Sequence, residues 1–247
     1  MASVFLTAHW RDLVLVNYRV PADLLRPLVP PGAVLDTPDR HPDRHFVSLV
    51  AFDFVGMRVK GLPVPTTGRF PEVNLRFYVR RGEQRATVFL KEFVPAPLVV
   101  LGARVLYQQP YELARISHRV EVGDGTRRVT TTFARGRHRG QIALEARDEP
   151  TTPPADSEEH FLKEHYWGFD RARNGEGFRY QVEHPVWRVF PVAHAAVTID
   201  PGALLGDAWR EIDWPAALHS VLYAEGSVAK VYGAEPLVAG EGPSPQP

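Results

Sequence analysis

The sequence predicts a mostly β (α+β) fold, and three observations support this prediction. Short segments rich in β-branched and aromatic residues recur along the 247-residue chain. The chain contains 23 prolines and 19 glycines, which indicate many turns. Few segments have helical character. We therefore expect one curved sheet, closed or nearly closed into a barrel, with two or three helices packed on it.

The N-terminal region begins with a strand and a short helix. Leu13–Val20 is rich in β-forming residues and ends at Pro21, and Ala22–Leu28 has helical character. Phe46–Val55 is apolar enough to form a mostly buried strand. The stretch Gly61–Pro71 is rich in proline and glycine and predicts a long ordered loop.

A hairpin and a buried helix follow. Val73–Arg80 and Thr87–Val94 flank a short polar turn and are expected to pair as strands. Leu98–Tyr107 is almost free of polar residues, and its length favours a helix over a strand. We expect a turn at Gln108–Pro110 and then another strand.

The C-terminal half is predicted to be strand-rich. Leu113–Val122 and Arg127–Ala134 flank a Gly-Asp-Gly turn, which predicts a second hairpin. Asp156–Tyr166 begins with Asp156 or Ser157 as the N-cap and has two glutamates in its first turn, which favours a helix. Further strands are expected at Gln141–Ala146, Gly177–Glu183, Val186–Phe190 and Ala193–Asp200, and in a last pair formed by Val221–Tyr223 and Ser227–Val231. Residues 1–238 would form a single β-barrel-like domain and 239–247 a disordered tail.

Composition excludes several classes of partner. The formal net charge is +0, which argues against nucleic acid or an anionic membrane as a partner. No 18-residue apolar stretch or signal peptide is evident, so we expect a cytoplasmic protein without a membrane span. There is no cysteine. His41 and His45 have the spacing of helical metal ligands, but Pro42 between them indicates a loop, and the other histidines form no metal-ligand pattern. We therefore expect no metal and no cofactor.

Several segments, in order, resemble the acetoacetate decarboxylase-like superfamily. They are WRDLVLVNYRVPADLLRPLVPPG (10–32), FPEVNLRFYV (70–79) and LGARVLYQQPYELARI (101–116). With EHYWGF (164–169) and VEHPVWRVFPV (182–192), the chain resembles more closely the uncharacterised YqjF-like family within that superfamily. This resemblance covers most of residues 5–235, and it implies a fold rather than an activity.

The resemblance also implies roles for four residues. Arg11 takes the place of an arginine that binds the substrate carboxylate, and Glu72 takes the place of an active-site glutamate. Tyr111 falls where the imine-forming lysine would be, and Glu112 falls where a neighbouring lysine would be. A phenol cannot form an imine with a ketone. We therefore do not expect acetoacetate decarboxylation by the usual lysine route.

The same residues have structural alternatives. Arg11 and Glu72 could bind a small anionic ligand and move a proton, because a guanidinium grips a carboxylate with two parallel hydrogen bonds. They could instead form a buried ion pair between strands. Tyr111 could donate a hydrogen bond to a ligand, or it could be a buried tyrosine with a satisfied hydroxyl.

Three further residues are candidates for ligand contact. Regular alternation would place Phe89, Lys91 and Phe93 on one strand face, so Lys91 could point into an apolar cavity as a relocated nucleophile. It could also reach solvent or pair with a carboxylate. Trp167 and His184 belong to two aromatic-rich segments that could line a small-molecule pocket or dock a helix on a sheet.

Three functions follow. The first is binding of a small molecule, with a carboxylate as one candidate group, in a decarboxylase-like cavity that lacks the Schiff-base lysine. The second is an enzyme that performs acid–base or lyase chemistry on a small oxo acid, with Glu72 as the catalytic proton shuttle. The third is a structural role in a homo-oligomer.

Overall fold

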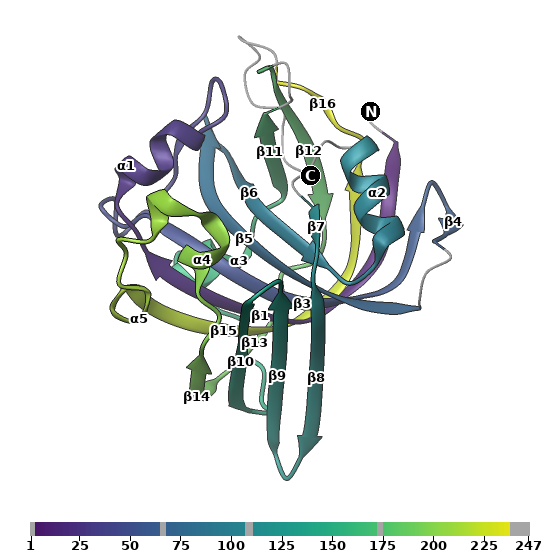
Figure 1. The fold of residues 1–247 in the computed structure, drawn as a ribbon, viewed down its shortest axis with the longest axis vertical. Coiled ribbons are helices and arrows are strands. Elements are labelled where there is room, and N and C mark those ends of the chain that lie inside the picture. The colour runs from purple at the N-terminus through teal and green to yellow at the C-terminus, as the bar shows by residue number, and fades with distance from the viewer. Residues whose placement is uncertain (1–2, 65–67, 107–110, 172–174, 238–247) are drawn as a thin grey trace.

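The computed structural model describes residues 3–64, 68–106, 111–171 and 175–237, and for 102–106 it describes the backbone only. The chain forms a large curved sheet and a four-stranded sheet, with short helices at their margins (Figure 1). This arrangement confirms the mostly β prediction. The predicted turn at Gln108–Pro110 and the predicted tail lie outside the described residues, so the division into one domain and a tail stays a prediction.

Seven strands make up the continuous part of the large sheet. In order of pairing they are β15 (Leu218–Tyr232), β1 (Val4–Arg19), β3 (Phe46–Val59), β5 (Arg69–Arg81), β6 (Gln84–Val94), β11 (Trp167–Arg171) and β12 (Gly177–Glu183). β12 also pairs with β15, so the pairings return to the first strand. Short strands extend the sheet at its margins: β2 (Val34–Leu35), β4 (Leu62–Pro63), β7 (Tyr111–Leu113), β13 (Val189–Phe190) and β16 (Glu235–Pro236).

The last long strand, β15, corrects one prediction. We expected two strands separated near Gly226, but β15 runs without a break from Leu218 to Tyr232 and pairs with β1. Gly226 has φ +77°, and a Cβ atom there would lie 2.1 Å from the carbonyl oxygen of Trp10. The glycine therefore allows a close approach of two strands and does not form a turn between them.

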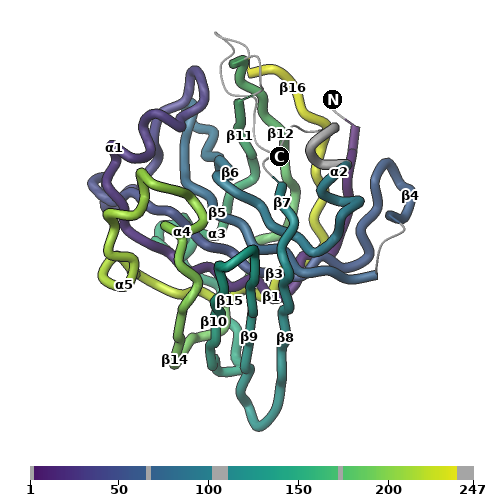
Figure 2. The backbone as a smooth tube through the Cα atoms, in the orientation of Figure 1, coloured from purple at the N-terminus to yellow at the C-terminus, as the bar shows by residue number. Residues whose placement is uncertain are grey.

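The smaller sheet has the order β14-β10-β9-β8 and extends beyond the large sheet as long hairpins (Figure 2). Its strands are β8 (Arg115–Gly123), β9 (Thr126–Arg135), β10 (His138–Arg147) and β14 (Val192–Val197). Asp124 and Gly125 join β8 to β9 with positive φ values of 52° and 70°. Two positive φ values are what a two-residue type I′ hairpin turn requires, which confirms the predicted second hairpin.

The described residues contain more helices than the predicted two or three. They are α1 (Ala22–Leu25), α2 (Pro97–Leu106), α3 (Glu158–Lys163), α4 (Pro201–Leu205) and α5 (Trp214–Ala217), with the 3-10 helices η1 (Arg26–Leu28) and η2 (Asp207–Trp209). α3 begins as predicted, because the Ser157 hydroxyl accepts a hydrogen bond from the backbone N–H of His160 at 3.1 Å. The missed helices α4 and α5 are too short to show helical periodicity. No helix in the described part of the chain is long and apolar enough to cross a membrane.

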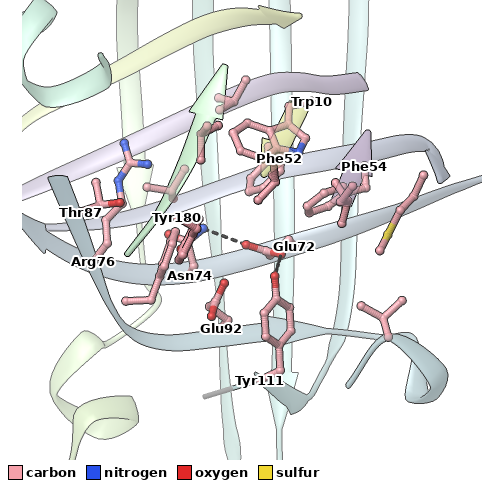
Figure 3. Close-up of a pocket in the computed structure, with 18 of the residues that line it drawn as sticks. Trp10, Phe52, Phe54, Glu72, Asn74, Arg76, Thr87, Glu92, Tyr111 and Tyr180 are labelled. Atoms are coloured by element: carbon pink, nitrogen blue, oxygen red, sulfur yellow. Dashed lines mark hydrogen bonds between the residues drawn. The ribbon is translucent and has the colours of Figure 1, made fainter. Parts of the chain in front are cut away.

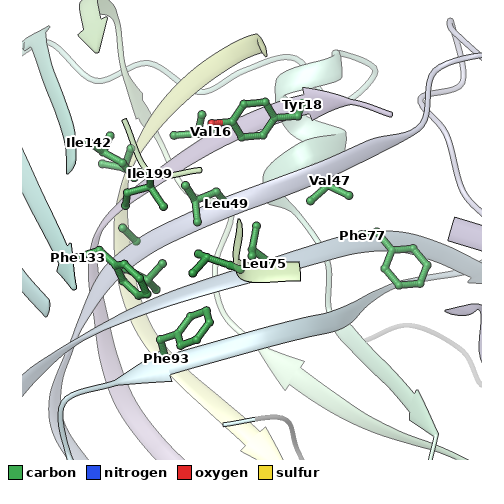
Figure 4. Packing of buried hydrophobic residues seen from close by; sticks show 14 of the residues in the cluster. Val16, Tyr18, Val47, Leu49, Leu75, Phe77, Phe93, Phe133, Ile142 and Ile199 are labelled. Carbon is green, nitrogen blue, oxygen red and sulfur yellow. The ribbon is translucent and has the colours of Figure 1, made fainter. Parts of the chain in front are cut away.

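The two faces of the large sheet are packed differently. One face rests on the smaller sheet, and apolar side chains fill the space between them (Figure 4). Leu49 and Leu75 of the large sheet are fully buried there with Phe133 and Ile142 of the smaller one. The opposite face packs partly against α3 through Phe161 and carries a second apolar cluster. This second face also encloses a cavity.

Candidate functional site

The second face of the large sheet encloses a cavity of about 260 Å³ (Figure 3). Most of its lining is apolar. Trp10, Phe52 and Phe54 form a continuous aromatic wall, in which the ring centroid of Trp10 lies 5.7 Å from that of Phe52 and 5.9 Å from that of Phe54. The polar lining residues are Glu72, Asn74, Arg76, Thr87, Glu92, Tyr111, His165 and Tyr180. The described lining residues include no lysine.

Strand pairing brings four of these polar residues together. Glu72 and Asn74 are two positions apart on β5, so both side chains point to the cavity face. Asn74 lies opposite Glu92 of β6, and Glu92 lies beside Tyr111 of β7. We call Glu72, Asn74, Glu92 and Tyr111 the carboxyl cluster.

Glu72 is fully hydrogen-bonded within the carboxyl cluster. Its Oε1 accepts from Nδ2 of Asn74 at 2.9 Å, and its Oε2 accepts from the hydroxyl of Tyr111 at 2.9 Å. The Tyr111 hydroxyl is also in hydrogen-bonding reach of the Glu92 carboxyl. By contrast, Oε2 of Glu92 and Oδ1 of Asn74 have no hydrogen-bond partner among the described residues.

Burial sets the protonation of the two carboxyl groups, each of which is only 2% exposed. Burial raises the pKa of Glu72 to about 7, although hydrogen bonds from Asn74 and Tyr111 oppose the shift. Burial also raises the pKa of Glu92 well above its ordinary value, and the nearby charge of Glu72 adds to this effect. The pair therefore retains a proton near neutral pH and can exchange it with a bound molecule.

Arg76 and His165 lie toward α3, further along the cavity. The guanidinium of Arg76 donates from Nη2 to the carbonyl oxygen of Leu162 at 3.2 Å. His165 is 7% exposed, and neither ring nitrogen has a hydrogen-bond partner among the described residues. Burial lowers the pKa of His165 well below its ordinary value, and the charge of Arg76 adds to the effect. The imidazole is therefore neutral at pH 7.

Arg11 lies outside the cavity and apart from Glu72. It is exposed, whereas its neighbours Trp10 and Leu13 line the cavity. The cause is a bulge at Asp12, which has φ 57° and coincides with a register shift between β1 and β3. The structure therefore does not bring Arg11 and Glu72 together as expected. Among the described residues, Arg76 is the arginine that lines the cavity.

Lys91 and Glu112 also lie away from the cavity lining. The Nζ of Lys91 is 2.5 Å from Oε1 of Glu112, which forms a second ion pair with Arg135 of the smaller sheet. A bulge in β6 pairs Lys91 with Leu75 and Phe89 with Arg76, so regular alternation ends there. The expected common face of Phe89, Lys91 and Phe93 is therefore wrong, and Lys91 takes the alternative of a paired lysine.

Trp167 and His184 lie at different depths. Trp167 lines the cavity, and the guanidinium of Arg179 lies 5.3 Å from the centre of its ring. His184 is not part of the lining; it stacks on Trp187, with 3.9 Å between ring centroids, and Trp187 itself lines the cavity. His184 thus supports the cavity wall from behind.

Sequence reasoning missed Asn74, Arg76 and Glu92, whereas His165 belongs to the aromatic-rich segment 164–169 that was considered as a pocket lining. Period-two alternation from Glu72 would have placed Asn74 and Arg76 on the same face, so this signal was present in the sequence. No comparable signal existed for Glu92, because the bulge in β6 changes its face.

In the described part of the chain, no group of three or more histidine and acidic side chains is arranged to hold a metal ion.

Comparison with solved structures defines the fold as acetoacetate decarboxylase-like. The acetoacetate decarboxylase from Legionella pneumophila superposes with a TM-score of 0.66 at 14% identity, covering 95% of this chain and 87% of that one. The enzyme MppR complexed with pyruvate gives 0.63 at 15% identity, with coverages of 96% and 92%. An acetoacetate decarboxylase-like enzyme from Sphingomonas wittichii RW1 gives 0.63 at 14% identity, with coverages of 95% and 94%.

The sequence itself places the chain in a narrower group. Residues 7–228 match DUF2071, a family described as an uncharacterized conserved protein, and the chain belongs to that family. It is 28% identical over 179 residues to the uncharacterized protein YqjF of Bacillus subtilis (strain 168), covering 72% of each chain. The resemblance inferred from the sequence motifs is thus confirmed.

Proposed function

We propose that the protein binds a small, largely apolar molecule in the cavity, with the polar group of that molecule against the carboxyl cluster. The observation that carries this proposal is the convergence of Glu72, Glu92 and Tyr111 within a mostly aromatic and aliphatic enclosure. Burying two carboxyl groups costs free energy that an apolar core would avoid. A ligand that uses these groups gives a reason for their presence.

The cavity favours non-covalent binding over imine chemistry. Tyr111 occupies the position that the resemblance assigns to the reactive lysine, and it is hydrogen-bonded to Glu72. The described lining residues include no amine that could attack a ketone. If the ligand carries a carboxylate, Arg76 is the residue to bind it, because Arg11 lies outside the cavity.

A second candidate function is acid–base catalysis by Glu72. Its support is the pKa of Glu72, which burial raises to about 7, where a carboxyl group both accepts and releases protons near neutral pH. Small oxo acids are the first substrates to test, because MppR, which has the same fold, is known in complex with pyruvate. Turnover that Glu72→Gln abolishes without loss of binding would select this function.

Leu98 and Leu101 of α2 provide a test of binding with a matched control. Both side chains are exposed, at 56% and 61%, but only Leu98 lines the cavity. Leu98→Trp should fill the cavity mouth, whereas Leu101→Trp places the same ring on the same helix away from the lining. Ligands that bind the native state raise the midpoint of thermal unfolding.

The measurement is a thermal-unfolding screen of small amines, alcohols, carboxylic acids and oxo acids. We expect at least one class to stabilise the wild type and Leu101→Trp but not Leu98→Trp. Stabilisation that is equal in both variants would place the binding elsewhere. No stabilisation by any class at millimolar concentration would contradict the proposed function.

A further inference from the structure

The carboxyl cluster presents unused hydrogen-bond acceptors to the cavity. Oε2 of Glu92 and Oδ1 of Asn74 have no hydrogen-bond partner among the described residues. The two residues are direct cross-strand neighbours on β6 and β5, and each is 2% exposed. Buried acceptors are almost always satisfied in folded proteins. Two adjacent unsatisfied acceptors in one cavity therefore indicate a ligand group that donates hydrogen bonds.

The hydrogen bonds within the carboxyl cluster determine which of its polar atoms remain as acceptors for a ligand. Asn74 uses its amide nitrogen on Oε1 of Glu72, so rotating the amide would set two oxygens against each other. The Tyr111 hydroxyl donates its single proton to Oε2 of Glu72. These two donors thus serve Glu72, whereas Oδ1 of Asn74 and, once Glu92 is ionised, its Oε2 remain as acceptors in the cavity.

The surroundings of the cluster also suit a positive charge. Phe52 is the cross-strand neighbour of Glu72, and Trp10 and Phe54 continue the same aromatic wall (Figure 3). Aromatic faces attract ammonium groups, most strongly where water is excluded. A cation beside Glu72 and Glu92 would also favour their charged forms, which burial alone disfavours.

Building on the proposed cavity function, we propose that the ligand is a small amine with an apolar body. Its ammonium group donates hydrogen bonds to Oε2 of Glu92 and Oδ1 of Asn74, and its apolar body rests against the aromatic wall. An ammonium group pairs with the ionised form of Glu92, whereas a carboxylate could bind at this position only if Glu92 kept its proton.

The alternative ligand is a carboxylate, which would bind at Arg76. Arg76 lies on the same strand face as Asn74, two positions further along β5, and contributes the positive charge among the described lining residues. A carboxylate ligand would bind at Arg76 and would gain nothing from Glu92. The two assignments therefore predict opposite sensitivities to substitutions at Glu92 and Arg76.

The experiment is isothermal titration of the full chain with three probes that share a phenyl body: 2-phenylethylamine, 2-phenylethanol and 3-phenylpropionate. We expect the amine to bind the wild type more tightly than either other probe. Glu92→Gln should weaken amine binding about tenfold or more, because a charge-assisted hydrogen bond becomes a neutral one. Arg76→Gln should leave amine binding within about twofold. Glu121→Gln, an exposed site on β8, is the matched control and should change nothing.

The outcomes separate this inference from the proposed function. Carboxylate binding that Arg76→Gln abolishes and Glu92→Gln leaves intact would overturn the amine assignment while supporting the cavity as a binding site. Failure of all three probes, together with a negative screen on the wild type, would remove both proposals. If Glu92→Gln does not fold, the ranking of the three probes on the wild type still decides, and a tighter carboxylate contradicts the inference.

Discussion

The two faces of β5 are equally buried yet chemically opposite. Val73, Leu75 and Phe77 are fully buried on one face and pack toward the smaller sheet. Glu72 and Asn74 alternate with them, are only 2% exposed, and line the cavity. Apolar packing accounts for the first face by itself. The second face keeps polar groups that packing does not require, and this difference locates the functional site.

The largest expected effect comes from removing a side chain on the packed face. Phe77→Ala should lower the free energy of unfolding by about 3–5 kcal/mol, because it leaves a cavity in a fully packed core. Urea unfolding measures this loss. A loss below about 1 kcal/mol would show that the packed face is not the stabilising one.

The next effect distinguishes the cavity face by its dependence on pH. Burial raises the pKa of Glu72 from its ordinary 4.5 to about 7, so the folded state binds a proton that the unfolded state has released between these values. The contribution of Glu72 to stability is fully present below pH 4.5 and is lost as pH rises through about 7. The loss is on the order of 3 kcal/mol at 1.36 kcal/mol per pKa unit.

Glu72→Gln should remove this dependence. Urea unfolding of the wild type and of the variant at pH 5 and pH 8 gives the difference directly, and exposed Glu121→Gln serves as the control for a change of net charge. We expect the stability advantage of Glu72→Gln to grow with pH. Parallel pH profiles for the wild type and Glu72→Gln would mean that Glu72 is not protonated in the folded state.

Tyr111→Phe should have a smaller effect, about 1 kcal/mol of unfolding free energy, because it removes one buried hydrogen bond to Glu72. It should also raise the pKa of Glu72 further, since the hydroxyl stabilises the charged carboxylate. In Tyr111→Phe, the loss of stability with rising pH would then extend to higher pH than in the wild type. An unchanged pH profile would show that Tyr111 does not influence the carboxyl group.

The smallest effect is expected at Arg11. Arg11→Ala should change stability by less than about 0.5 kcal/mol, as is usual for exposed residues without special contacts. Titration with any ligand found in the screen should give the same affinity within about twofold. Loss of binding in Arg11→Ala would show that Arg11 contacts the ligand, as the resemblance implies. It would contradict the assignment of the binding site to the cavity face of β5.

Much of the fold could be predicted because it depends on local signals. Most strand patterns, the Gly-Asp-Gly hairpin turn and the N-cap at Ser157 are visible in the sequence and are confirmed, whereas the break expected within β15 is not. Gly226 shows the limit of this reasoning, because its close approach to Trp10 depends on a strand more than two hundred residues away in the chain. A glycine that allows backbone contact and a glycine that forms a turn look the same in sequence.

The candidate site was less predictable because two bulges re-aim its side chains. The bulge at Asp12 separates Arg11 from the cavity, and the bulge in β6 turns Lys91 outward and places Glu92 inside. A one-residue irregularity reverses the face of every later side chain, and its position depends on the pairing of distant strands. Neither bulge precedes Glu72 or Tyr111 in its own strand, and both residues line the cavity, where the resemblance placed them.

The most direct test of the carboxyl cluster is a carbon-13 NMR titration of the glutamate side-chain carboxyl groups, with and without a ligand from the screen. We expect Glu72 to titrate near pH 7 in the free protein and its titration to shift when a ligand binds, while the exposed Glu121 shows no response to the ligand. If Glu72 titrates near its ordinary value of 4.5 and ignores every ligand, the cavity is not the functional site.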